Sequence, residues 1–182
     1  MDSQPFFDVA ASVERVGQYQ WLEQRLFELM GSLISDTDDP EVAFFLGSQS
    51  FHHEFLAEQW ARRLGHLGGE ASAVQAPRDA VRSLFEPQVW AGQPIGACLA
   101  GLYRTVLPRL AGIYSAHLSS IDPALSGATA RVLNLAGNDY RADWVAGEFF
   151  TQKYLESDEM VSDAVRFRGE LELALGAGPG LI

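Results

Sequence analysis

The chain has 182 residues, with 24 Asp and Glu against 13 Lys and Arg, and therefore a formal charge of −11 at neutral pH. This length suits one domain with a substantial core, and a hydrophobic content of 47% with 11% aromatics excludes a disordered acidic chain. The charge argues against nucleic acid and against an anionic membrane as partners, because both are bound through Lys and Arg.

Cysteine content and the N-terminus suggest a compartment. A single cysteine, Cys98, excludes an internal disulfide, and its apolar neighbours predict a buried, inert thiol. The N-terminal MDSQPFFDV is acidic where a signal peptide is basic, and no apolar run approaches membrane-spanning length. We therefore expect a cytoplasmic protein.

Helical periodicity extends along most of the chain, and the period-two alternation of strands is not found. We expect four long helices and a shorter fifth, at about residues 7–34, 40–64, 94–118, 123–155 and 159–174. A short helix is expected at 80–85, a turn at 86–94 and a tail at 176–182. This order predicts an all-α fold over residues 1–182, a four-helix bundle (core 8–155) with an additional short C-terminal helix.

Local signals refine these elements. Asp39 and Asp122 each precede a proline, which predicts that each aspartate caps a helix whose first position is Pro. Pro108 lies inside the third helix and should kink it, which would open room for a ligand near Arg104.

Acidic and imidazole side chains fall inside the apolar stripes that should face the bundle core. Because a buried carboxylate needs a partner, these residues should contact one another, in a cluster of acid–base or metal-ligand type. The candidate catalytic residues are Glu23, His53, Asp139 and Asp143. The candidate ligand-binding residues around them are Gln49, His52, Tyr103, Arg104, Tyr114 and His117.

Three long runs carry a family resemblance: LGSQSFHHEFLAEQWARRL (46–64), GLYRTVLPRLAGIYSAHL (101–118) and VLNLAGNDYRADWVAGE (132–148). They are similar to actinobacterial proteins of the ferritin-like superfamily, and the similarity covers about residues 8–155. The resemblance implies a ferritin-like bundle with a di-iron ligand set of Glu, Glu-x-x-His, Glu and Glu-x-x-His from the four helices.

The sequence keeps only part of that ligand set. Glu23 matches the first-helix ligand, but the second helix offers Gln49-Ser-Phe-His52 or Ser50-Phe-His-His53 without the Glu. No acid occurs between Glu86 and Asp122, so the third-helix ligand is missing, and the fourth helix has Asp139 and Asp143 at the wrong spacing. A degenerate metal site is therefore expected in place of a standard di-iron centre.

Three interpretations of the cluster remain open. The first is a metal-free pocket that binds, and could transform, a small organic molecule. In the second, some of Glu23, His53, His117, Asp139 and Asp143 hold a single Fe, Mn or Zn ion, as in a metal-dependent oxygenase. The third is a non-catalytic polar layer that sets helix register.

Two further expectations concern contacts at the bundle surface. Trp21 lies off the apolar arc of its helix and is a candidate contact with another subunit, which together with the resemblance favours a homodimer. Arg104 and Arg109 lie on a helix without acids and could pair with acids of neighbouring helices.

Overall fold

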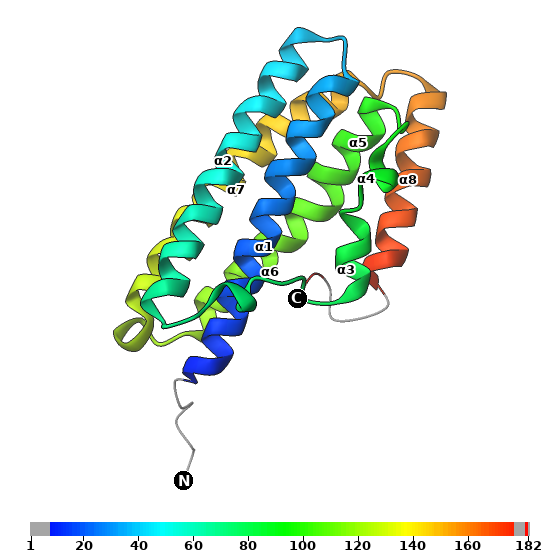
Figure 1. Cartoon of the computed structure of the whole chain (residues 1–182). Helices are drawn as coiled ribbons and strands as arrows, with labels where there is room; N and C mark the ends of the chain where they lie inside the picture. The colour runs from blue at the N-terminus through cyan, green and yellow to red at the C-terminus, as the bar shows by residue number, and fades with distance from the viewer. Residues whose placement is uncertain (1–7, 177–180, 182) are drawn as a thin grey trace.

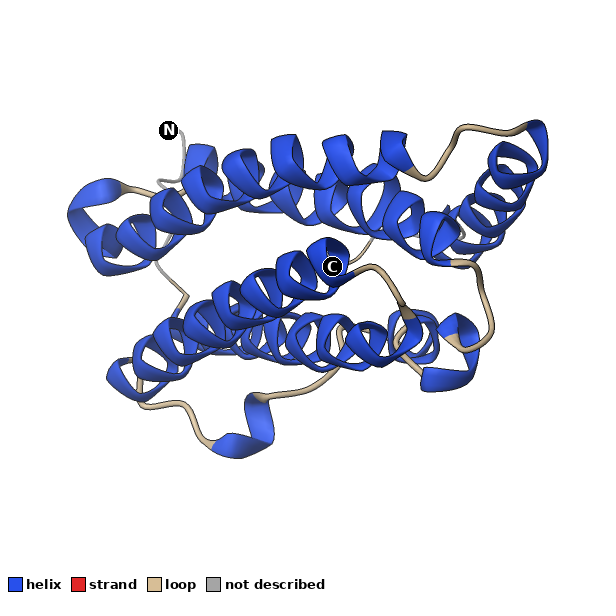
Figure 2. Cartoon of the chain, turned by 90° about the horizontal axis from the view of Figure 1, so that it is seen from above, coloured by secondary structure: helices blue, strands red, loops and turns tan. Residues whose placement is uncertain are grey.

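The computed structural model describes residues 8–176 and 181, and regular structure in this part of the chain is helical throughout (Figure 2). The α-helices are α1 (Val9–Leu33), α2 (Pro40–His66), α3 (Asp79–Leu84), α4 (Pro87–Trp90), α5 (Ile95–Gly101), α6 (Leu107–Ser120), α7 (Pro123–Lys153) and α8 (Asp158–Gly176). Short 3-10 turns follow α1 and α2, η1 (Ile34–Asp36) and η2 (Ala71–Ala73), and a π-helical segment η3 (Leu102–Val106) joins α5 to α6.

The predicted all-α fold is confirmed, and the five main helices lie within a few residues of their predicted bounds. The predicted turn at 86–94 contains the one-turn helix α4. Of the predicted tail at 176–182, residues 177–180 and 182 lie outside the described residues, as do residues 1–7 at the other end. None of the helices in the described part of the chain is both long and apolar enough to span a bilayer.

Four long helical segments pack side by side around one core. In Figure 1, α1 and α2 lie together, α7 runs behind α2, and the α5–η3–α6 segment runs behind α1. Helix α7 contacts both α2 and α6, and α8 packs along α5 at the other edge of the molecule. Inward-facing residues of these segments therefore meet at the centre, where the sequence placed its candidate site.

Most of the predicted inward residues are buried, with corrections on α1 and α7. Phe27 and Leu135, which the apolar periodicity of their helices predicts to face the core, are 36% and 37% exposed. On α7, Leu133, Ala136 and Tyr140 face the core instead of Leu135. Trp21 is only 8% exposed and packs edge-on against Phe85, with ring centroids 5.7 Å apart. The prediction that Trp21 contacts another subunit is wrong, because the segment after η2 folds back over it.

Cys98 is buried on α5, as predicted. Burial raises the pKa of its thiol to about 12, so the nucleophilic thiolate is not formed near neutral pH.

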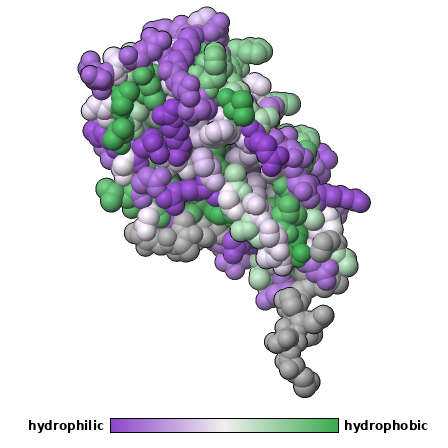
Figure 3. Space-filling view, turned by 180° about the vertical axis from the view of Figure 1, so that it is seen from behind, coloured by the Kyte–Doolittle hydropathy of each residue, from purple (hydrophilic) through white to green (hydrophobic). Residues whose placement is uncertain are grey.

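The surface of the molecule is mixed: on the rear face, hydrophobic side chains form separate groups among hydrophilic ones (Figure 3).

Both predicted aspartate caps are confirmed. Asp122 Oδ1 accepts the backbone N–H of Ala124 at 2.8 Å, and Asp39 Oδ1 accepts that of Glu41 at 2.8 Å. The other oxygen of Asp39 accepts from Lys153 Nζ at 3.0 Å and from the Tyr154 hydroxyl at 2.8 Å. Asp39 therefore connects the start of α2 to the end of α7.

This connection predicts a pH dependence of stability. Hydrogen bonds from Lys153 and Tyr154 lower the pKa of Asp39 from 3.8 to about 2. A carboxyl with a lowered folded-state pKa stabilises the fold fully above its unfolded value and ceases to do so as the pH falls through the folded value. In urea unfolding, the stability difference between wild type and Asp39→Asn should be largest above pH 4 and vanish near pH 2.

The matched control is Asp122→Asn, at the corresponding cap of α7, where the carboxylate accepts only the Ala124 N–H among the described residues. Its stability difference from wild type should change less over the same pH range. An Asp39→Asn difference that is constant from pH 6 to pH 2 would contradict the role of the Lys153 and Tyr154 contacts.

Pro108 acts through the π-helical segment that precedes it. The Leu107 N–H donates to the Leu102 carbonyl five residues back, and Pro108 has no N–H to offer the Arg104 carbonyl. Arg168 of α8 supplies the missing donor, with Nη2 3.3 Å from the Arg104 carbonyl oxygen. The widened turn holds Tyr103 against α7 at Gly147, next to the candidate site.

Candidate functional site

A carboxylate fixed by three side chains lies at the centre of the bundle. Glu23 of α1 is fully buried, and its Oε2 is 2.6 Å from Nδ1 of His53 on α2. Its Oε1 accepts hydrogen bonds from the hydroxyl of Tyr114 on α6 at 2.5 Å and from that of Tyr140 on α7 at 3.0 Å. One carboxylate thus joins all four long helical segments.

The electrostatics of this cluster keep its tyrosines protonated. Burial first, and then the charge of Glu23, raise the pKa of Tyr114 and of Tyr140 well above the ordinary value. Both hydroxyls therefore remain donors to the carboxylate.

Nε2 of His53 is buried and has no hydrogen-bond partner among the described residues. This is unusual, because leaving a buried polar atom unpaired costs about 1–3 kcal/mol of stability.

A second polar cluster lies toward the α2–α7 surface. Asp143 accepts from Gln49 Nε2 at 3.1 Å and is 3.1 Å from Nδ1 of His52, whose side chain is 43% exposed. The Tyr103 hydroxyl donates to Gln49 Oε1 at 3.5 Å. Asp139 is half-buried one turn away, and burial together with the charge of Asp143 raises its pKa.

Seven of the ten predicted site residues are divided between two clusters, and Asp139, Arg104 and His117 belong to neither. Glu23, His53 and Tyr114 lie in the first, and Gln49, His52, Tyr103 and Asp143 in the second. The carboxylate that contacts His53 is Glu23, and Asp143 contacts the neighbouring His52 instead. The two histidines point to different acids, as expected for adjacent positions about 100° apart on a helix.

Arg104 takes no part in either cluster. Its guanidinium forms two hydrogen bonds with Glu148 of α7, at 2.9 and 2.6 Å, and Arg109 pairs with Glu172 of α8. The expectation that these arginines pair with acids of neighbouring helices is confirmed. The π-helical segment opens none of the described cavities at Arg104, because the side chain is held by Glu148.

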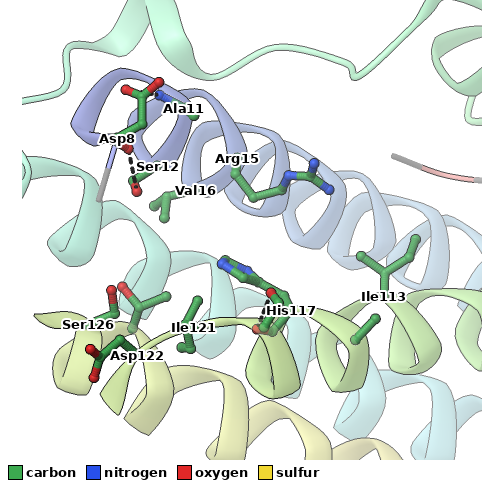
Figure 4. Close-up of a pocket in the computed structure, with 13 residues that line it drawn as sticks. Asp8, Ala11, Ser12, Arg15, Val16, Ile113, His117, Ile121, Asp122 and Ser126 are labelled. Carbon is green, nitrogen blue, oxygen red and sulfur yellow. Dashed lines mark hydrogen bonds between the residues drawn. The ribbon is translucent and has the colours of Figure 1, made fainter. Parts of the chain in front are cut away.

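A cavity of about 600 Å³ lies at one end of the bundle, between the start of α1, the end of α6 and the start of α7. Figure 4 shows Arg15 and Val16 on its α1 side facing His117 and Ile113 of α6 across the opening. Its other lining residues are Asp8, Ala11, Ser12, Ala116, Ser120, Ile121, Asp122, Ser126 and Thr129. The lining combines apolar side chains with hydroxyls and charges.

His117 is fixed in this cavity by a buried tyrosine. The hydroxyl of Tyr19 lies 2.9 Å from Nδ1 of His117, and Tyr19 is fully buried. Burial raises the pKa of Tyr19, while burial and the charge of Arg15 lower that of His117. A protonated Tyr19 can donate its hydroxyl to Nδ1 of neutral His117, and in that tautomer the ring proton lies on Nε2.

An aromatic path connects this cavity to the central carboxylate. The rings of Tyr19 and Tyr114 meet edge-on with centroids 4.7 Å apart, and Tyr114 bonds Glu23. Trp60 of α2 donates its indole N–H to the Tyr114 hydroxyl at 3.2 Å. A second cavity, of about 450 Å³, lies between α6 and α7 with Tyr114, Tyr140 and Trp144 in its lining. Tyr114 therefore has the central carboxylate on one side and this second cavity on the other.

The donor set does not fit the di-iron centre that the resemblance implies. Both oxygens of Glu23 are taken up by His53, Tyr114 and Tyr140. Among residues 8–176 and 181, no group of three or more His, Cys, Asp or Glu side chains is arranged to hold a metal ion. Helices α6 and α7 present the tyrosine hydroxyls of Tyr114 and Tyr140 to Glu23.

Several residues of these sites were not predicted from the sequence: Arg15, Tyr19, Tyr140 and Thr129. Tyr140 continues the α7 stripe of Leu133 and Ala136 at helical spacing, so the periodicity contained its signal. Arg15 and Tyr19 had no such signal, because their role depends on how α1 packs against α6.

The chain matches no protein-family model, no curated protein and no solved structure. The residues and cavities described above are therefore the basis for assigning a function.

Proposed function

We propose that this protein is a ferritin-like bundle without a standard di-iron centre, and that it binds a small organic molecule in the cavity beside His117. The observation that carries the proposal is the cavity itself. Its volume of about 600 Å³ is in the range of small-molecule sites, which combine apolar walls with a few fixed polar groups. The site differs from the one expected at the bundle centre, where Glu23 and its partners fill the space.

His117 and Arg15 give this cavity its chemistry. Neutral His117, with Nδ1 engaged by Tyr19, offers an N–H at Nε2 to a bound molecule. Arg15 contributes a positive charge on the opposite wall, and Val16, Ile113 and Ile121 contribute apolar surface. A neutral imidazole can also accept or donate a proton, which is what acid–base chemistry on a bound molecule requires.

The expected result is saturable binding of 8-anilinonaphthalene-1-sulfonate, whose aromatic rings match the apolar walls and whose sulfonate can pair with Arg15. Fluorescence titration should give one site per chain. Ala116→Trp, which places an indole in the cavity wall, should weaken that binding at least tenfold because the volume is filled.

Ala142→Trp is the matched control, because Ala142 is exposed on α7 and lines none of the described cavities. It should bind the probe like wild type. Equal loss in both variants, or no saturable binding to wild type, would contradict the proposed site.

A further inference from the structure

One face of α2 exposes three phenylalanines. Phe44, Phe51 and Phe55 are 82%, 66% and 43% exposed. Their spacings of seven and four residues place them on one stripe of the helix, opposite the stripe of Leu46, His53 and Trp60 that faces the core. A stripe of this kind on a long helix is the pattern of a helix–helix contact.

Helix α7 also exposes apolar side chains at the level of this stripe. Stacking of Phe45 on Phe150, at 4.6 Å between centroids, and the pairing of His52 with Asp143 fix the relative level of the two helices. Val145 and Phe149, 61% and 65% exposed, are therefore level with the stripe on α2. We call the surface of Phe44, Phe51, Phe55, Val145 and Phe149 the aromatic face.

The aromatic face is large enough for a specific contact. With about 200 Å² for each phenylalanine side chain, the exposed fractions amount to roughly 500 Å² of apolar surface. This equals the largest apolar patch of a typical monomer and is most of the roughly 800 Å² that each partner contributes to a standard interface.

We propose that the aromatic face binds a second copy of this chain, with α2 antiparallel to the partner's α2. A twofold axis near Ser50 would bring Phe44 close to the partner's Phe55, because the stripe is nearly symmetric about its middle. The same surface would then serve both subunits, as a twofold dimer requires.

Charges along α2 favour this partner and this direction. No Asp, Glu, Lys or Arg occurs from Val42 to His53, so the net charge of −11 is not concentrated on the stripe. Asp38, Asp39 and Glu41 make the start of α2 acidic, whereas in its C-terminal half Glu54 and Glu58 are balanced by Arg62 and Arg63. An antiparallel pair places each acidic start near the neutral half of the partner's α2, where Arg62 lies, whereas a parallel pair would bring the two acidic starts together.

Sedimentation velocity on the full chain tests the proposal. Wild type should sediment at twice the chain mass of 19.9 kDa. Phe51→Glu should be a monomer with unchanged helicity, because the side chain is mostly exposed in a single chain. Leu173→Glu, at a 79% exposed position on α8, is the matched control and should remain a dimer.

A charge exchange separates a second copy from any other partner. Arg62→Glu and Glu41→Arg should each raise the dimer dissociation constant severalfold, and the double variant should restore it, because both charges then change places on both chains. Monomeric wild type at 100 µM protein, or equal effects of Phe51→Glu and Leu173→Glu, would overturn the proposal. A dimer that the charge exchange leaves unrestored would overturn the antiparallel arrangement.

Discussion

Replacing Glu23 with alanine should lower the free energy of unfolding by about 3–5 kcal/mol, the usual cost of removing one partner from a buried ionic contact. The variant leaves His53 Nδ1 and the hydroxyls of Tyr114 and Tyr140 without their shared acceptor. Each buried donor left unpaired costs about 1–3 kcal/mol. Urea unfolding followed by circular dichroism measures the difference.

One further variant distinguishes the loss of the Glu23 charge from the loss of its hydrogen bonds, and another serves as a control. Glu23→Gln keeps an acceptor for the tyrosines, so it should lose less stability than Glu23→Ala. Glu54→Ala, at an exposed position of α2, should stay within about 0.5 kcal/mol of wild type. A loss below about 1 kcal/mol for Glu23→Ala would show that the cluster relaxes around the gap.

Variants of Glu23 and His53 test whether the central cluster is a structural layer or part of a functional site. The double variant Glu23→Met and His53→Leu leaves no buried ionic partner alone, but it still removes the acceptor of the Tyr114 and Tyr140 hydroxyls, so we expect a stability between those of Glu23→Ala and wild type. Unchanged binding of 8-anilinonaphthalene-1-sulfonate by this variant would assign the central cluster to holding the helices in register. Lost binding would connect it to the cavity through Tyr114 and Tyr19.

Gly147→Ala should be the most damaging single-methyl change in α7. A Cβ at this position would lie 2.1 Å from the Tyr103 ring, far inside van der Waals contact. Tyr103 is fully buried in the π-helical segment, so its ring would have to displace other core side chains to give way. We expect a loss of about 3 kcal/mol or more, at the upper end for overpacked cores, measured by urea unfolding.

Gly137→Ala is the control for this prediction, on the same helix and with nothing within 4 Å of the added methyl group. It should raise stability by up to about 1 kcal/mol, because alanine is the better helix former. Similar effects of the two substitutions would mean that the Tyr103 contact is not tight.

The positions of the helices could be predicted from the sequence, because they depend on local chemistry. The Asp-Pro caps at Asp39 and Asp122 and the periodicity of apolar residues act within a few residues of chain, and the structure reproduces them. The inward placement of Glu23 and His53 followed from the same periodicity. Exceptions such as Leu135 arose because a small rotation of α7 changes which residues at the edge of a stripe are covered.

The tyrosines and the cavity depend on contacts between helices. His117 is defined by Tyr19, 98 positions away in the sequence, and Tyr140 reaches Glu23 across 117 positions. Trp21, which its own helix leaves on the surface, is buried by Phe85. Periodicity assigns a residue to a face of its own helix, and it does not specify which helix covers that face.

The sequence by itself determined an acidic, all-helical chain with Glu23 and His53 directed inward, and a missing third-helix acid that weakens any standard di-iron site. Only the tertiary structure decided that Tyr114 and Tyr140 bond Glu23, that Asp143 pairs with His52, and that the large cavity lies beside His117. The physical reason is range: helix formation and capping are set within one or two turns, whereas pairings between helices depend on the level and rotation at which whole helices pack.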